Sequence, residues 1–219
     1  MYHVIAMPPA GVPFPDLWVR PADFAGQMRW LARHGYHAVT LHSVYEYWVA
    51  GAPLPRRAIV ISFDDGYLSQ HTKAFPVLQR LHWPGVLNLK VNAVQKYNLP
   101  FWRVRALADA GWEIDAHTIT HPDLTTVDDR RLWQEVRGSR VAIRRMFHVP
   151  VDFFCYPSGR YDARVIDAVR RAGYLGATTT NYGPARPSNL YTLSRIRVSG
   201  SDGVAGFAGK MEGLPASPY

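Results

Sequence analysis

Two carboxylates in this 219-residue sequence stand where they could take part in acid–base chemistry or bind a cation. Asp64 and Asp65 are adjacent, follow an apolar run at 59–63 that only one serine interrupts, and precede Gly66. Neighbouring carboxylates repel each other, so a site that keeps both usually supplies a cation or separates their pKa values. Taken alone, Asp65-Gly66 could equally be an ordinary turn.

Two histidines form the second candidate pair. His117 and His121 follow a predicted strand at 112–116, and residues four apart can contact one metal ion from one helical face or a tight loop. In a chain with nine histidines the spacing alone is weak evidence. Two histidines and one carboxylate are, however, a catalytic zinc set with one coordination position left open. If Asp65 is the third ligand, Asp64 is free to act as a base toward water.

Alternating strand and helix patterns predict how these side chains are positioned. We expect strands at 1–6, 36–41, 58–63, 85–91, 112–116, 151–155, 174–179 and 191–198. We expect helices at 21–35, 43–50, 72–81, 101–110, 128–147 and 162–172, with a short one after Asp202. This alternation predicts parallel βαβ units in one α/β domain, residues 1–210, with a tail at 211–219. Both candidate pairs follow strands and should therefore emerge at one end of the sheet, and Asn88 and Lys90 should point into its mouth.

The composition limits the classes of function. With 47% hydrophobic and 19% charged residues, the chain is globular rather than disordered. No apolar run approaches the ~20 residues of a transmembrane helix, and the single cysteine excludes an internal disulfide. The net charge of +8 is spread over scattered arginines without a basic run, so we expect no nucleic-acid binding and at most a weak attraction to an anionic surface or cell-wall polymer. We expect a monomer.

Two motifs carry a family resemblance. The segment 62–66, Ser-Phe-Asp-Asp-Gly, resembles the [TS]-F-D-D-G motif of the polysaccharide deacetylases (carbohydrate esterase family 4, the NodB-homology domain). The segment 117–121 resembles their H-[ST]-x-x-H motif, in the same order and at a matching separation. The resemblance implies a distorted (β/α) barrel of about seven strands, (β/α)7-type, and a divalent metal, with zinc expected and cobalt or nickel as alternatives. It makes Asp64 the base and Asp65, His117 and His121 the metal ligands.

The third family motif, F-R-x-P-x-G, is altered in this chain. Residues 154–159 read Phe-Cys-Tyr-Pro-Ser-Gly, so Cys155 stands where many members have the arginine that pairs with the catalytic Asp. The candidates to replace that arginine are Arg160, Arg195 and Arg197. Ser158 matches the position whose backbone N–H stabilises the oxyanion in the family.

The family's C-terminal general-acid histidine is also missing, because the segment 193–198 contains none. Met1-Tyr2-His3 resembles instead the opening of a circularly permuted branch, which includes biofilm poly-N-acetylglucosamine deacetylases. In that branch the acid comes from the first strand. The resemblance therefore makes His3 the general acid.

The sequence thus predicts a metal-dependent hydrolase that removes N-acetyl groups from an N-acetylglucosamine-containing polysaccharide. The alternatives are a deacylase of another substrate, such as O-acetyl xylan or a non-sugar amide, and a catalytically silent glycan-binding module on the same scaffold. The first residues lack the basic and long apolar regions of a signal peptide. We expect an extracellular or cell-surface location, reached with a leader removed upstream, and a cytoplasmic location stays open.

Overall fold

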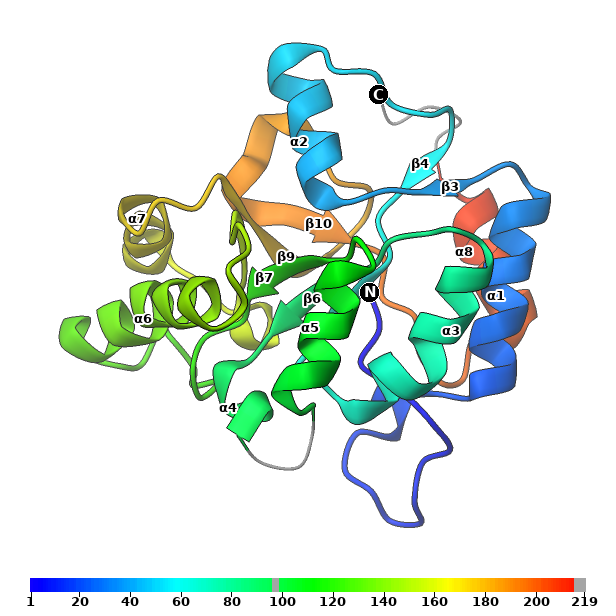
Figure 1. The fold of residues 1–219 in the computed structure, drawn as a ribbon, viewed down its shortest axis with the longest axis horizontal. Helices are drawn as coiled ribbons and strands as arrows, with labels where there is room; N and C mark the ends of the chain where they lie inside the picture. Colours follow the sequence, from blue (N-terminus) through cyan, green and yellow to red (C-terminus); the bar gives the residue numbers. More distant parts are fainter. Residues whose placement is uncertain (96–98, 215–219) are drawn as a thin grey trace.

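Six parallel strands form the central sheet of the protein (Figure 1). In spatial order they are β10 (Leu193–Arg195), β9 (Gly176–Tyr182), β8 (Phe153–Cys155), β7 (Glu113–Ala116), β6 (Val86–Leu89) and β5 (Ser62–Asp64). Every residue of β5, β6 and β8 is buried, as expected for parallel strands that are covered on both faces. The computed structural model describes residues 1–95 and 99–214.

The N-terminal segment joins the two edges of this sheet. Tyr2 donates its backbone N–H to β5 (2.8 Å) and accepts one from it (2.9 Å). On the other side, the Met1 nitrogen donates to the carbonyl of Ile196 (2.6 Å), and the Met1 carbonyl accepts from Val198 (3.2 Å). Since β5 and the segment after β10 are the sheet edges, this insertion gives a barrel-like closure. The predicted single-domain α/β barrel is confirmed.

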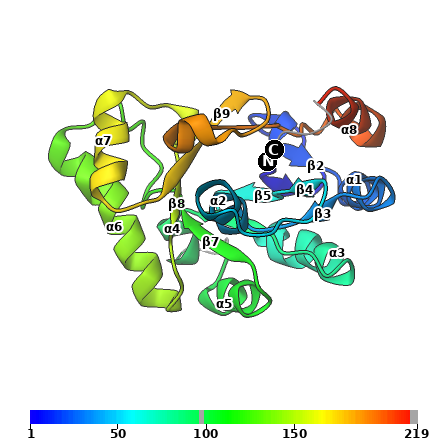
Figure 2. The same cartoon turned by 90° about the horizontal axis from the view of Figure 1, so that it is seen from above.

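Helices surround the strands, as Figures 1 and 2 show from two directions. They are α1 (Pro21–Arg33), α2 (Leu41–Ala50), α3 (Phe75–Arg80), α4 (Val91–Gln95), α5 (Phe101–Asp109), α6 (Asp129–Phe147), α7 (Ala163–Arg171) and α8 (Gly203–Glu212). Side chains cap several of them: Asp128 accepts the N–H of Arg131 at the start of α6, and Asp162 does the same for Val165 in α7. None of the helices in the described ranges is long and apolar enough to cross a membrane.

Helix α2 covers one end of the barrel. Its first residue, Leu41, packs in a buried cluster with Val86, Phe153 and Leu193, which are the first residues of β6, β8 and β10. This cluster fills the end of the barrel at which the strands begin. The C-terminal ends of the strands are therefore the ends left for polar side chains.

Of the places where the structure differs from the expected elements, four bear on the strands or the motifs. The strand expected at 58–63 is two short strands, because β4 (Ala58–Ile59) pairs with β3 (His37–Ala38) whereas β5 pairs with β6. Strand β2 (Trp18–Val19), which pairs with β1 (Val4–Ile5), was not expected.

The remaining two differences lie beside the predicted catalytic motifs. The strand expected to reach residue 91 ends at Leu89, and α4 begins at Val91. The helix expected at 72–81 is preceded by a π-helical turn, Gln70–Ala74. Of the predicted tail, residues 211 and 212 belong to α8, and residues 215–219 lie outside the described part of the chain.

Candidate active site

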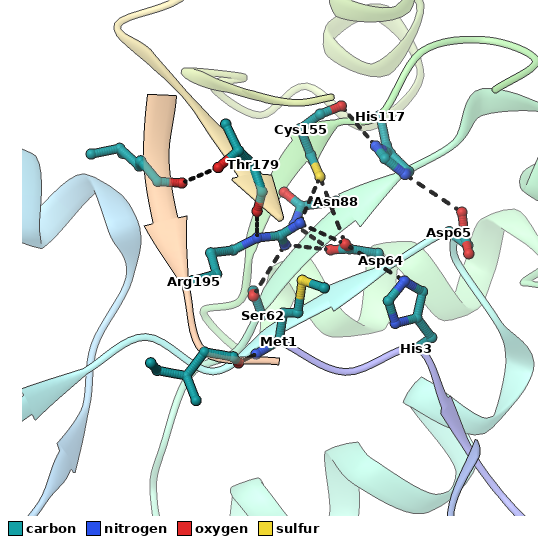
Figure 3. A network of polar contacts seen from close by, with 12 residues as sticks. Met1, His3, Ser62, Asp64, Asp65, Asn88, His117, Cys155, Thr179 and Arg195 are labelled. Carbon is teal, nitrogen blue, oxygen red and sulfur yellow. Dashed lines mark hydrogen bonds and ion pairs between the residues drawn. The ribbon is translucent and has the colours of Figure 1, made fainter. Parts of the chain in front are cut away.

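Both predicted pairs lie at the C-terminal edge of the sheet, after β5 and β7, and Figure 3 shows Asp64, Asp65 and His117 there. Asp64 is the last residue of β5, and Asp65 follows it with a left-handed φ of 77°. His117 follows β7 directly, and β6 lies between these two strands. Parallel strands bring their C-terminal ends to one edge, which is where α/β folds place ligand sites. The structure therefore brings the four motif residues together.

Three of these side chains form a cluster with the geometry of a metal site. Asp65 Oδ1 lies 3.5 Å from His117 Nε2 and 3.6 Å from His121 Nε2, and all three ligand atoms are within 4.8 Å of one another. Ligand atoms bound at about 2.0–2.1 Å to a tetrahedral zinc ion lie about 3.3 Å apart. The three side chains fit a divalent metal with only small adjustments.

Hydrogen bonding leaves the correct nitrogen of His117 available. Its Nδ1 donates to the backbone carbonyl of Cys155 (2.7 Å), so Nε2 is the atom with a free lone pair, and this atom faces Asp65. A second possible group, Asp64, His117 and Cys155, shares this histidine. Arg195 contacts both Asp64 and Cys155, and its positive charge disfavours a cation there. The Asp65 group is the better metal site.

The loop that carries His121 is held by Glu135 of α6. This buried carboxylate accepts the backbone N–H groups of Ile119 (2.7 Å) and Thr120 (2.9 Å). Thr118 and His121 have left-handed φ angles of 65° and 66°, which cost energy in non-glycine residues. The bonds to Glu135 compensate for that cost and fix the direction in which His121 points.

Asp64 is buried and paired with Arg195 of β10. Arg195 Nη1 donates to Asp64 Oδ1 and Nη2 donates to Oδ2, each at 2.8 Å. Burial alone would raise the pKa of Asp64, but the charge and hydrogen bonds of Arg195, together with His3, hold that pKa far below its ordinary value. Asp64 is thus an ionised carboxylate that can accept a proton.

Of the three arginines that could replace the missing motif arginine, only Arg195 contacts Asp64. Its Nε donates to the Thr179 carbonyl (2.8 Å), and its Nη2 lies 3.2 Å from Cys155 Sγ. Arg160 instead forms an ion pair with Asp123 near the surface. Because the guanidinium lies against the thiol, the small side chain at 155 leaves the room that Arg195 occupies.

His3 lies on the other side of Asp64. Its Nε2 is 3.9 Å from Asp64 Oδ2, longer than a hydrogen bond. Gln70, from the π-helical turn, donates to the backbone carbonyls of both His3 (2.9 Å) and Asp64 (2.6 Å) and so ties their segments together. Burial lowers the pKa of His3, although the charges of Asp64 and Asp65 oppose that effect. A histidine with a lowered pKa gives up its proton more readily.

Three further residues belong to this region or were expected in it: Asn88, Gln70 and Ser158. Asn88 points into the barrel, as expected, and its Nδ2 donates to Asp64 Oδ1 at 2.7 Å. Gln70 was not expected, and its only signal is a polar residue four positions after the Asp-Asp-Gly motif. Ser158 is exposed on the turn after β8 and has a left-handed φ of 52°.

The sequence is similar to a protein family and to individual proteins of known name. The sequence model described as polysaccharide deacetylase matches residues 51–177. The chain is 27% identical to YxkH of Bacillus subtilis over 216 residues, covering 98% of this chain and 75% of that protein. It is 29% identical to the poly-beta-1,6-N-acetyl-D-glucosamine N-deacetylase of Staphylococcus epidermidis, covering 83% of this chain and 68% of that protein.

Its fold is similar to that of the deacetylase PplD of Streptococcus pyogenes, which was solved in complex with acetate. The TM-score is 0.87, and the match covers 96% of this chain and 95% of that one at 24% identity.

Proposed function

We propose that this chain, which belongs to the polysaccharide deacetylase family, hydrolyses N-acetyl groups of a polymer that contains β-1,6-linked N-acetylglucosamine. The substrate is inferred from the Staphylococcus epidermidis relative, whose name specifies that polymer. The observation that carries the chemistry is the pairing of Asp64 with Arg195 beside the cluster of Asp65, His117 and His121.

In this proposal the two adjacent carboxylates have separate tasks. Asp65, His117 and His121 hold a divalent metal, for which zinc suits the two imidazoles and one carboxylate. Such an ion, when bound, lowers the pKa of water and polarises a carbonyl group. Asp64 accepts the proton of the attacking water, and Arg195 keeps it ionised for that purpose.

The remaining residues act on the acetamide. The Ser158 N–H donates to the oxygen that becomes negative as water adds to the carbonyl carbon. His3 gives its proton to the nitrogen as the carbon–nitrogen bond breaks, so acetate and a free amine leave. Because a polymer is the substrate, we propose an extracellular or cell-surface location.

The test compares Asp64→Asn with the wild type. We expect the variant to bind zinc with unchanged affinity and to release acetate from poly-β-1,6-N-acetylglucosamine about 100- to 10,000-fold more slowly, the usual contribution of a general base. Asp109→Asn, which changes an exposed ion pair with Arg105, is the matched control. Acetate release by Asp64→Asn at the wild-type rate would contradict the assignment of the base.

A parallel assay decides between substrates. Acetate release is measured from the glucosamine polymer, from O-acetyl xylan and from a small N-acetyl amide. We expect the highest kcat/KM on the polymer. Faster release from xylan would make the chain an O-deacetylase. Zinc-independent binding of the polymer without acetate release would make it a silent binding module.

A further inference from the structure

We propose that Asn88 is a positioning residue that determines which oxygen of Asp64 accepts the proton. Its amide occupies Oδ1 from the neighbouring strand and leaves Oδ2 as the basic atom. This inference rests on the proposed role of Asp64 as the base. It assigns a task to a residue outside the four sequence motifs.

The two oxygens of Asp64 differ in the hydrogen bonds that they accept. Oδ1 accepts from Asn88 Nδ2 at 2.7 Å and from Arg195 Nη1 at 2.8 Å. A carboxylate oxygen has two lone-pair positions, so these two donors saturate Oδ1.

Oδ2 has spare accepting capacity. It accepts one strong bond, from Arg195 Nη2 at 2.8 Å. Its other neighbours are Cys155 Sγ at 3.7 Å, a weak donor, and His3 Nε2 at 3.9 Å, which is beyond hydrogen-bond reach. The second lone pair of Oδ2 is therefore engaged only by this weak thiol bond, which a water proton can replace on the side where His3 lies (Figure 3).

The register of the sheet places Asn88 accurately. Asp64 and Asn88 are paired positions of β5 and β6, so their side chains project from the same face of the sheet. The backbone carbonyl of Asn88 also accepts the N–H of Asp65 at 3.1 Å. One residue thus holds the side chain of the proposed base and the backbone of the adjacent metal ligand.

The amide suits this task better than the alternatives of similar size. It donates a hydrogen bond at every pH of interest and adds no charge beside Asp64. An aspartate at 88 would place a second carboxylate 2.7 Å from Oδ1 and repel it. A leucine, with nearly the same shape, would free a lone pair on Oδ1, and the carboxylate could then bind the proton on the wrong oxygen.

The test measures kcat, KM, zinc affinity and melting temperature for Asn88→Leu and Asn88→Asp. We expect kcat to fall about 10- to 100-fold in Asn88→Leu, the effect of losing one hydrogen bond to a charged group, with KM and zinc affinity within about twofold of wild type. In Asn88→Asp we expect a larger fall, because the new carboxylate also repels Asp64. Thr178→Val is the matched control, because it removes a buried hydroxyl that has no hydrogen-bond partner among the described residues. We expect it to keep the wild-type kcat.

The outcomes separate this inference from the proposed function. If Asn88→Leu does not fold, the isosteric Asn88→Asp carries the test. Wild-type kcat in the folded Asn88 variant, with Asp64→Asn inactive, overturns the inference alone. Activity in Asp64→Asn overturns the proposed base first. A fall in zinc affinity parallel to the fall in kcat would make Asn88 a structural support of the metal loop and would also overturn the inference.

Discussion

Arg195 forms a bidentate ion pair with Asp64, with both N···O distances at 2.8 Å, although 131 positions separate the two residues in the sequence. Planar guanidinium and carboxylate groups match in this geometry, which a lysine cannot reproduce. The pair also fills the place next to Cys155 where the family motif has an arginine. The charge that stabilises the proposed base is therefore supplied by a different strand from the one that the motif indicates.

Replacing Arg195 should separate charge from geometry. We expect Arg195→Lys to keep a positive charge but lose one of the two bonds, and to lower kcat about 10-fold or more. Arg195→Met leaves a buried carboxylate without its partner and should lower the free energy of unfolding by about 3–5 kcal/mol. Urea unfolding and acetate release are measured, with the exposed Arg197→Met as control. Wild-type stability of Arg195→Met would show that Asp64 does not depend on this pair.

His3 should matter only when the leaving group needs a proton. We expect His3→Gln to slow the release of acetate from the N-acetylated polymer about 100-fold or more. The same variant should cleave 4-nitrophenyl acetate at nearly the wild-type rate, since nitrophenolate leaves without protonation. His37→Gln, which changes an exposed histidine of β3, is the control. An equal loss on both substrates would remove His3 from the role of acid.

Glu135 should affect the metal without touching it. In Glu135→Gln an NH₂ group, which cannot accept a hydrogen bond, replaces one carboxylate oxygen. The variant therefore loses either the two bonds from the backbone of Ile119 and Thr120 or the bond from the Thr120 hydroxyl. We expect zinc affinity to fall about 10- to 100-fold, the usual effect of disturbing a ligand's support. Competition with a coloured chelator measures it, and Glu46→Gln, at a partly exposed position of α2, is the control. Unchanged affinity would mean that the loop holds its shape without Glu135.

A buried carboxyl pair predicts how stability depends on pH. Glu113 and Asp115 project from the same face of β7, and their buried carboxyl groups can hydrogen-bond to one another only if one of them keeps a proton. Burial raises the pKa of Glu113 above its ordinary value of 4.5. The folded protein therefore keeps a proton that the unfolded chain loses, and stability falls as pH rises from 4.5 through the raised pKa.

Glu113→Gln should remove part of this pH dependence. We expect the free energy of unfolding of the metal-free wild type to decrease between about pH 5 and about pH 8 by roughly 1 kcal/mol more than that of the variant. Urea titrations at both pH values measure the difference. Glu212→Gln, at the exposed end of α8, should behave as the wild type does. Parallel pH profiles for Glu113→Gln and wild type would contradict the raised pKa.

The sequence was sufficient for the fold class and for the residues next to strand ends. Buried strands and amphipathic helices are local patterns. Asp64 ends such a strand, and Asp65 and His117 follow such strands immediately. Parallel strands then bring these residues to one edge without further information. The roles of these residues stay predictions until the variants are measured.

Other features depend on tertiary contacts that no local pattern contains. Arg195, rather than Arg160 or Arg197, pairs with Asp64 because the end of β10 lies close to Asp64 across the barrel. Segment 58–63 is divided into two strands because its first part pairs with β3 and its last part with β6. Its nearly continuous hydrophobic pattern gives no sign of this change of neighbour. Gln70 reaches two carbonyls only because a π-helical turn directs it inward.

The closure of the barrel has a consequence for the order of folding. The Met1–Ile196 hydrogen bond joins positions 195 apart, whereas the strands from β5 to β10 pair in chain order. Contacts of such long sequence separation carry a large loop-closure entropy and tend to slow folding. The sheet can assemble before its edges meet, but His3 reaches Asp64 only when the first segment has entered between them. The proposed acid–base pair should therefore form late in refolding, after the proposed metal ligands are already in place.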